Sequence, residues 1–66
     1  MSELIMLKRD CTGDGCWTKI SVSELYQLGA YVDYYKENNI LADCIDRMVT
    51  LDYDGKVTQV IALAVE

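Results

Sequence analysis

The C-terminal segment most constrains what this chain can fold into. Residues 57–65 read Val-Thr-Gln-Val-Ile-Ala-Leu-Ala-Val, with no polar side chain between positions 60 and 65. A strand with one face in water alternates apolar and polar residues, whereas a strand covered on both faces does not. Because a chain of 66 residues has too little material to cover both faces of a strand, we expect a second chain to supply cover. The candidate self-association residues are Val60, Ile61, Leu63 and Val65.

The composition is that of one small domain spanning residues 1–66. Apolar residues make up 52% of the chain, which excludes a disordered protein. The apolar segments are too short to cross a bilayer. The first positive charges, Lys8 and Arg9, follow the N-terminal apolar residues, the reverse of their order in a secretion signal. We therefore expect a soluble cytoplasmic protein that does not bind a membrane.

The net charge of −5 restricts the class of partner. Nucleic acid and anionic membranes attract clustered Lys and Arg, and here only Lys8 and Arg9 are adjacent. We expect no direct binding to nucleic acid. A protein with a basic surface is the favoured partner, and the alternative is that the charge serves solubility alone.

Turn residues at positions 12–15 predict an N-terminal hairpin, because they separate two apolar segments. A loop of those four residues places Leu7 opposite Ile20 and Cys11 opposite Cys16. The residues expected to share one face are Ile5, Leu7, Cys11, Cys16 and Ile20.

A capping box at Ser21-Val22-Ser23-Glu24 predicts the start of a long helix over residues 22–37. The Ser21 hydroxyl is placed to accept a hydrogen bond from the backbone N–H of Glu24. Helical spacing predicts a core stripe of Leu25, Leu28, Tyr31, Val32 and Tyr35. The same spacing predicts an outer stripe of Tyr26, Ala30 and Tyr34 among Asp33 and Glu37.

A C-terminal hairpin is predicted from strands at 48–53 and 56–65 around the turn Asp54-Gly55. A two-residue turn would separate the apolar faces of the two strands. One extra residue at a bulge places Tyr53 opposite Val57 and gathers the apolar side chains on one side. We therefore favour the bulged turn.

The expected fold is α+β: a small antiparallel sheet of about four strands with one long helix packed on one face, in the order β-β-α-(α)-β-β. Residues 40–48 are ambiguous between helix and strand, and apolar residues every four positions favour a short helix. The alternative is a winged helix-turn-helix. That second helix would bring Asp43 and Asp46 against DNA phosphates with Arg47 alone to offset them, which disfavours this fold.

No residue pattern predicts catalysis, a metal centre or a cofactor site. The chain has no His and no Gly-rich phosphate loop, so we expect no enzymatic activity. Cys11 and Cys16 are a candidate disulfide, and the alternative is that they are small apolar residues of a tight hairpin. With Cys44 as the third and last thiol, a zinc site lacks its fourth ligand. The Asp-containing turns at 10–15 and 52–55 lack the carboxylate that completes a calcium loop.

The functional hypothesis is a small acidic protein that forms a homodimer and binds another protein as an inhibitor or regulator. Tyrosine is favoured at protein interfaces because its rigid apolar ring carries a polar tip. The candidate partner-binding residues are Tyr26, Tyr34, Asp33 and Glu37. In brevity, acidity and lack of catalytic residues the chain is similar to small inhibitors that phages make, a likeness of composition that covers no motif. The alternatives are a small-ligand-binding dimer and an inhibitor that mimics nucleic acid.

Overall fold

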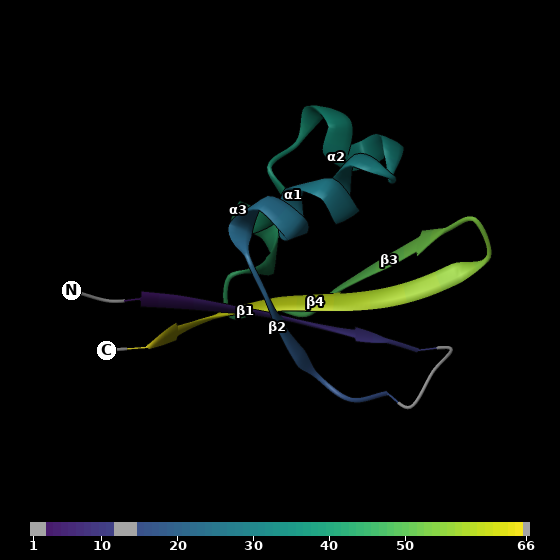
Figure 1. The fold of residues 1–66 in the computed structure, drawn as a ribbon. Coiled ribbons are helices and arrows are strands. Elements are labelled where there is room, and N and C mark those ends of the chain that lie inside the picture. The colour runs from purple at the N-terminus through teal and green to yellow at the C-terminus, as the bar shows by residue number, and fades with distance from the viewer. Residues whose placement is uncertain (1–2, 12–14, 66) are drawn as a thin grey trace.

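A computed structural model describes residues 3–11 and 15–65 of the chain. In this part of the chain, four strands form one antiparallel sheet of order β2-β1-β4-β3, and three short helices lie together on one side of it (Figure 1). The strands are β1 (Glu3–Asp10), β2 (Thr18–Ile20), β3 (Val49–Tyr53) and β4 (Lys56–Val65). The helices are α1 (Val22–Ala30), α2 (Asp33–Glu37) and α3 (Ile40–Cys44). The predicted α+β class and antiparallel sheet are confirmed.

The C-terminal strand β4 lies inside the sheet, with β1 along one side and β3 along the other. Its pairing with β1 runs without interruption from Thr58 to Val65, whereas β3 pairs only with residues 56–60. Past β3, Ile45 bridges to Ala62, whose carbonyl accepts a hydrogen bond of 2.7 Å from Asp46 N–H. Both edges of β4 are therefore paired within this chain, and no second chain is needed to pair this strand. Cover of its two faces is a separate question.

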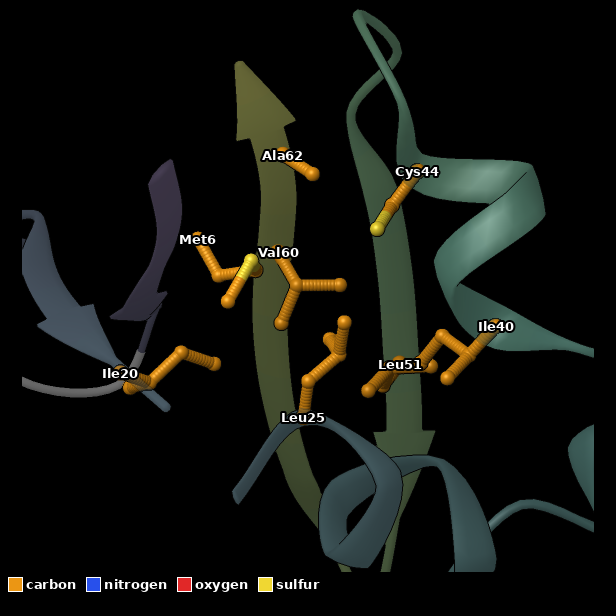
Figure 2. Close-up of a cluster of buried hydrophobic side chains, with 8 residues drawn as sticks. All are labelled: Met6, Ile20, Leu25, Ile40, Cys44, Leu51, Val60 and Ala62. Carbon is orange, nitrogen blue, oxygen red and sulfur yellow. The ribbon is translucent and has the colours of Figure 1, made fainter. Parts of the chain in front are cut away.

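The hydrophobic core lies between the sheet and the helices (Figure 2). It consists of Met6, Ile20, Leu25, Ile40, Cys44, Leu51, Val60 and Ala62. Leu25 from α1 points at Val60 and Leu51 on the strands, and all three are at most 1% exposed. The buried hydroxyl of Thr58 donates a hydrogen bond of 3.1 Å to the Asp10 carboxylate, so this polar group is satisfied.

The capping box is confirmed, because Ser21 Oγ accepts a hydrogen bond of 3.1 Å from the N–H of Glu24. The single long helix over residues 22–37 is wrong. The chain leaves the helical conformation at Val32, where φ is −110° and ψ is 125°, and a separate helix α2 follows. The break allows the Tyr31 ring to stack on Tyr53 of β3, with 5.0 Å between centroids. Tertiary contact with the sheet therefore outweighs continuation of the helix.

The short helix favoured within residues 40–48 is present as α3, and Gly29 explains how closely it approaches α1. A Cβ atom at Gly29 would lie only 3.1 Å from Cγ2 of Ile40. Since Ile40 is fully buried, it has no room to move away. Gly29 thus allows the two helices to pack closely above the sheet.

Both predicted hairpin registers are wrong by one residue. In the C-terminal hairpin Leu51 pairs with Thr58, and no bulge is present in the paired residues 49–60. Asp54 (φ 49°) and Gly55 (φ 73°) have the positive φ values of a two-residue type I′ turn. That turn matches the twist of the strands, so turn geometry set the register rather than the collection of apolar residues on one side.

In the N-terminal hairpin Ile20 pairs with Met6 instead of Leu7. Ile20 therefore belongs to the core face, while Ile5 and Leu7 lie on the opposite face. Apolar residues occupy both faces of β1, so the hydrophobic pattern could not select the register. Residues 12–14 of the predicted turn lie outside the described residues.

Candidate interaction surface

The face of the sheet away from the helices, here termed the uncovered face, is largely apolar. All three helices lie on the other side (Figure 1). Because side chains alternate along a strand, residues next to the core residues Met6, Val60 and Ala62 point to this face. Its apolar side chains are those of Ile5, Leu7, Val57, Ile61, Leu63 and Val65.

One end of the sheet extends past the helices. The start of β1 and the end of β4 continue together beyond the helical layer (Figure 1). This terminal ribbon, residues 3–5 and 63–65, exposes apolar side chains on both faces. Leu4 is 39% exposed on the helical side, while Leu63 and Val65 are 38% and 42% exposed on the uncovered face. An apolar surface of this kind is typical of an interaction site.

A polar cluster closes the opposite end of the uncovered face. Arg9 Nε donates a hydrogen bond of 2.6 Å to the side-chain carbonyl of Gln59. Its guanidinium carbon lies 4.9 Å from the ring centroid of Trp17, the geometry of a cation–π contact. These contacts place polar groups near the turns, where Trp17 is 39% exposed, while Leu63 and Val65 are the exposed apolar residues at the terminal ribbon.

Charge is separated between the two sides of the molecule. Residues 22–46, which form the helical side, carry five carboxylates and one Lys, a formal net charge of −4. The five carboxylates are those of Glu24, Asp33, Glu37, Asp43 and Asp46. On the described part of the uncovered face the formal charges sum to zero, because two acidic residues offset two basic ones. They are Glu3, Asp52, Arg9 and Lys19. The segment that forms the helices is therefore acidic, whereas the described part of the uncovered face is neutral in charge and largely apolar.

The four candidate partner-binding residues lie on the helical side, divided by the break at Val32. Tyr26 belongs to α1, and its hydroxyl donates a hydrogen bond of 3.0 Å to Asn39 Oδ1. That oxygen also caps α3 by accepting from Leu41 N–H. Tyr26 therefore joins α1 to α3 instead of continuing one stripe with Tyr34.

The other three candidates belong to α2. The exposed Tyr34 packs edge-on against Tyr35, with 4.9 Å between ring centroids. The Asp33 carboxylate forms an exposed ion pair of 3.0 Å with Lys36, and Glu37 is exposed. The arrangement presents an aromatic ring with carboxylates close by in the chain.

Tyr31 was missed as a surface residue, because helical spacing placed it in the core. It is 61% exposed and contributes one ring face to the stack with Tyr53. Tyr35 is the ring that lies at the core edge. Burial raises the pKa of Tyr35 above its ordinary value, and a hydrogen bond to Asp43 adds to the rise. Only the position of the helix break could have distinguished the two tyrosines.

The four candidate self-association residues are divided between the two faces of the sheet. Val60 is fully buried beneath the helices. Ile61, Leu63 and Val65 lie on the uncovered face. Ile5 and Leu7 share that face and were missed, because the incorrect hairpin register placed them with Ile20. The sequence did carry a signal for them: Leu4-Ile5-Met6-Leu7, like residues 60–65, does not alternate apolar and polar side chains.

The thiols occupy two kinds of environment. Cys11 and Cys16 are exposed, and the observed register, continued along β2, sets Cys16 opposite Asp10 instead of Cys11. The disulfide between them stays a prediction. Cys44 is buried, its thiol donates to the Leu41 carbonyl at 3.6 Å, and burial raises its pKa.

Within residues 3–11 and 15–65, no three His, Cys, Asp or Glu side chains group closely enough to hold a metal ion. None of the helices in this part of the chain is long and apolar enough to cross a membrane. The sequence matches no protein-family model, and no curated protein or solved structure is significantly similar to it.

Proposed function

We propose that this chain is a non-enzymatic, acidic interaction protein that self-associates and binds a second protein with a basic surface. The observation that supports it best is the separation of surfaces: an apolar terminal ribbon on one part of the molecule, and carboxylates with exposed tyrosines on the helical side. A protein with two such surfaces can join two kinds of partner without competition between them.

Self-association is assigned to the terminal ribbon because its apolar side chains are exposed on both faces of the sheet. Burying apolar surface stabilises a complex by about 25 cal/mol for each Å² removed from water. Leu4, Leu63 and Val65 each retain more than a third of their surface exposed. In this chain their burial requires another molecule.

Binding of a basic protein is assigned to the helical side. Complementary charge speeds association and selects the partner, while exposed aromatic rings supply contact area at low entropic cost. The exposed rings of Tyr31 and Tyr34 lie in or beside α2, close in the chain to Asp33 and Glu37. A chain without His is poorly equipped for acid–base chemistry at neutral pH. We infer that it acts by occluding a surface of its partner, as an inhibitor or regulator does.

Sedimentation velocity over a range of protein concentrations tests self-association. The double variant Leu4→Lys/Leu63→Lys places a charge on each face of the terminal ribbon and should be monomeric where the wild type associates. Val22→Lys/Met48→Lys is the matched control, because both residues are exposed and apolar but lie outside the ribbon. Equal association of all three proteins would contradict the role of the ribbon.

Affinity capture from a lysate of the source cells tests the second partner. The wild type should retain a protein that Tyr34→Ala loses, and capture should weaken as salt rises. Thr50→Ala, an exposed change on the other side of the molecule, is the matched control and should retain it. A partner that both variants retain, at low and high salt alike, would contradict the assignment to the helical side.

A further inference from the structure

The uncovered face carries opposite charges at its two ends and apolar side chains between them. The residues that β1 contributes to this face are, in order, Glu3, Ile5, Leu7 and Arg9. Their partners on β4 are Val65, Leu63, Ile61 and Gln59. An acidic residue therefore begins the row along β1, a basic residue ends it, and the middle of the face is apolar on both strands.

Neither of these two charges has an ion-pair partner in the part of the chain that the structure describes. The Arg9 guanidinium donates from Nε to Gln59 and lies over the Trp17 ring, but no carboxylate among residues 3–11 and 15–65 pairs with it. Glu3 is exposed, and no Lys or Arg in the same residues pairs with it. Both charges are therefore available to a molecule that covers this face.

We propose that two copies of the chain pack uncovered face against uncovered face, with β1 of one copy antiparallel to β1 of the other. This inference rests on the proposed self-association and names its contact. The two-fold axis runs across the strands, between the two sheets, at the level of the paired residues Met6 and Ala62. Residue 3 of each copy then faces residue 9 of the other, and residue 5 faces residue 7. The helices of both copies remain on the outside (Figure 1).

Charge complementarity selects this arrangement. Glu3 of each copy faces Arg9 of the other, and the symmetry forms this ion pair twice. A shift of two residues along the strands would set Glu3 over Leu7 in one direction, or Arg9 over Ile5 in the other, which places a charge against an apolar side chain. A two-fold axis along the strands would set Glu3 over Val65 or over the second Glu3. Only the proposed arrangement gives both charges an opposite partner.

The same arrangement covers the apolar middle of the face. Ile5 faces Leu7 and Leu63 faces Ile61, each twice, so branched side chains of both copies form one apolar layer. Sheets packed face to face lie about 10 Å apart, a gap that side chains of this size fill. Leu63, which is 38% exposed in one copy, is thereby removed from water.

The charge and size of this face suit a second copy. Its described formal charges sum to zero, so two copies meet here without the repulsion that two helical sides, each with a formal charge of −4, would impose. The contact spans about 24 Å along the strands and about 15 Å across them, roughly 350 Å² of flat area in each copy. With the relief of the side chains, the two copies bury about 1,000 Å² together, the size at which specific interfaces begin. We therefore expect a weak dimer in exchange with the monomer.

Mixing two charge-reversal variants tests the orientation. Glu3→Lys brings two positive charges together in both contacts and Arg9→Glu brings two negative charges together, so each variant alone should dimerise roughly tenfold to a hundredfold more weakly than the wild type. In the mixture, both contacts of the heterodimer join opposite charges, and affinity should return to within about tenfold of the wild type. Native mass spectrometry distinguishes the heterodimer from the homodimers by mass. Circular dichroism and cooperative unfolding check that each variant folds.

Lys19→Glu is the matched control for Arg9→Glu. It makes the same change of charge on the same face, but Lys19 belongs to β2 and does not face Glu3 in the proposed dimer. A mixture of Glu3→Lys and Lys19→Glu should form no more heterodimer than Glu3→Lys forms with the wild type. Equal yields of heterodimer from this mixture and from Glu3→Lys with Arg9→Glu would overturn the proposed orientation.

Two single variants distinguish failure of this packing from failure of the proposed function. Leu63→Lys places a charge in the apolar layer and should raise the dimer dissociation constant at least about a hundredfold, whereas Leu4→Lys, on the helical side, should change it less than about threefold. If Leu4→Lys dissociates the dimer and Leu63→Lys does not, face-to-face packing is overturned while self-association stands. If the wild type remains monomeric at millimolar concentration, self-association and face-to-face packing are both overturned.

Discussion

The two halves of β4 differ in composition and in surroundings, and the more apolar half, residues 61–65, includes the residues with the least cover. Residues 58–60 lie between β1 and β3, and the inward side chains of Thr58 and Val60 are buried beneath the helices. Past Ala62, β4 runs beyond the helical layer (Figure 1), and on the helical face Ala62 is buried while Ala64 is exposed. Hydrophobicity alone did not decide which half is core. The extent of the helices above the sheet did.

The largest expected effect separates a core residue from a ribbon residue of the same type. Leu51→Ala should lower the free energy of unfolding by about 3 kcal/mol, because it leaves a cavity in a closely packed core. Leu63→Ala should lower it by less than about 1 kcal/mol, because part of the side chain is already in water. Urea denaturation with all proteins in the same oligomeric state measures both. Equal losses would mean that the ribbon is as well covered as the core.

Gly29→Ala tests how closely α1 and α3 pack against each other above the sheet. In an exposed helix this change gains about 1 kcal/mol of stability. Here the added methyl group meets buried Ile40 at 3.1 Å, so we expect a net loss of about 1 kcal/mol. Ile40→Val removes Cδ1, the second closest atom, and should recover part of the loss in the double variant. A stabilised Gly29→Ala would show that α3 can move away from α1.

Arg9→Met tests the polar cluster on the uncovered face near the turns. The variant keeps an apolar stem but loses the hydrogen bond to Gln59 and the cation–π contact with Trp17. We expect a loss of about 0.5–1 kcal/mol in chemical denaturation and a change in Trp17 fluorescence. Lys19→Met, on the same face, should leave the fluorescence unchanged. An unchanged emission in Arg9→Met would mean that the ring is not held by Arg9.

Alkaline pH should lower the free energy of unfolding through Cys44 and Tyr35, and these two groups should have no such effect at neutral pH. Burial raises the pKa of Cys44 above 9.0 and that of Tyr35 above 10.0, so the native state holds protons that the unfolded state has released. The contribution of each group is complete below its ordinary pKa and is lost as pH rises through the raised value. Stability should therefore fall from about pH 9 upward. Cys44→Ala/Tyr35→Phe should show a smaller slope with pH in urea denaturation, and an identical slope would contradict these assignments.

Local signals in the sequence predicted elements more reliably than the contacts between them. The Ser21 cap depends on residues three positions apart, and the turn at Asp54-Gly55 depends on two adjacent residues, so both were visible in the sequence. The hairpin registers were not, because apolar residues lie on both faces of β1 and β4. The helix break at Val32 was also hidden, since it depends on contact between Tyr31 and Tyr53, 22 positions away.

The candidate surfaces follow the same division. The lack of polar–apolar alternation in residues 60–65 indicated a strand with apolar side chains on both faces. Residues 4–7 carry the same signal. Which of those side chains are buried depended on the face that each one occupies, which separated Val60 from Leu63 and Val65, and on where the helices end, which separated buried Ala62 from exposed Ala64.

The amino-acid sequence by itself determined the order of the strands and helices, the turn and cap residues, and the excess of negative charge, because these depend on neighbours in the chain. The tertiary structure decided which apolar residues form the core, where the long helix is interrupted, and that acidic and apolar surfaces lie on different sides. Those features depend on packing between segments far apart in the sequence. The uncovered face is the clearest case, because its apolar residues come from β1 and β4, which are far apart in the sequence and become neighbours only by pairing.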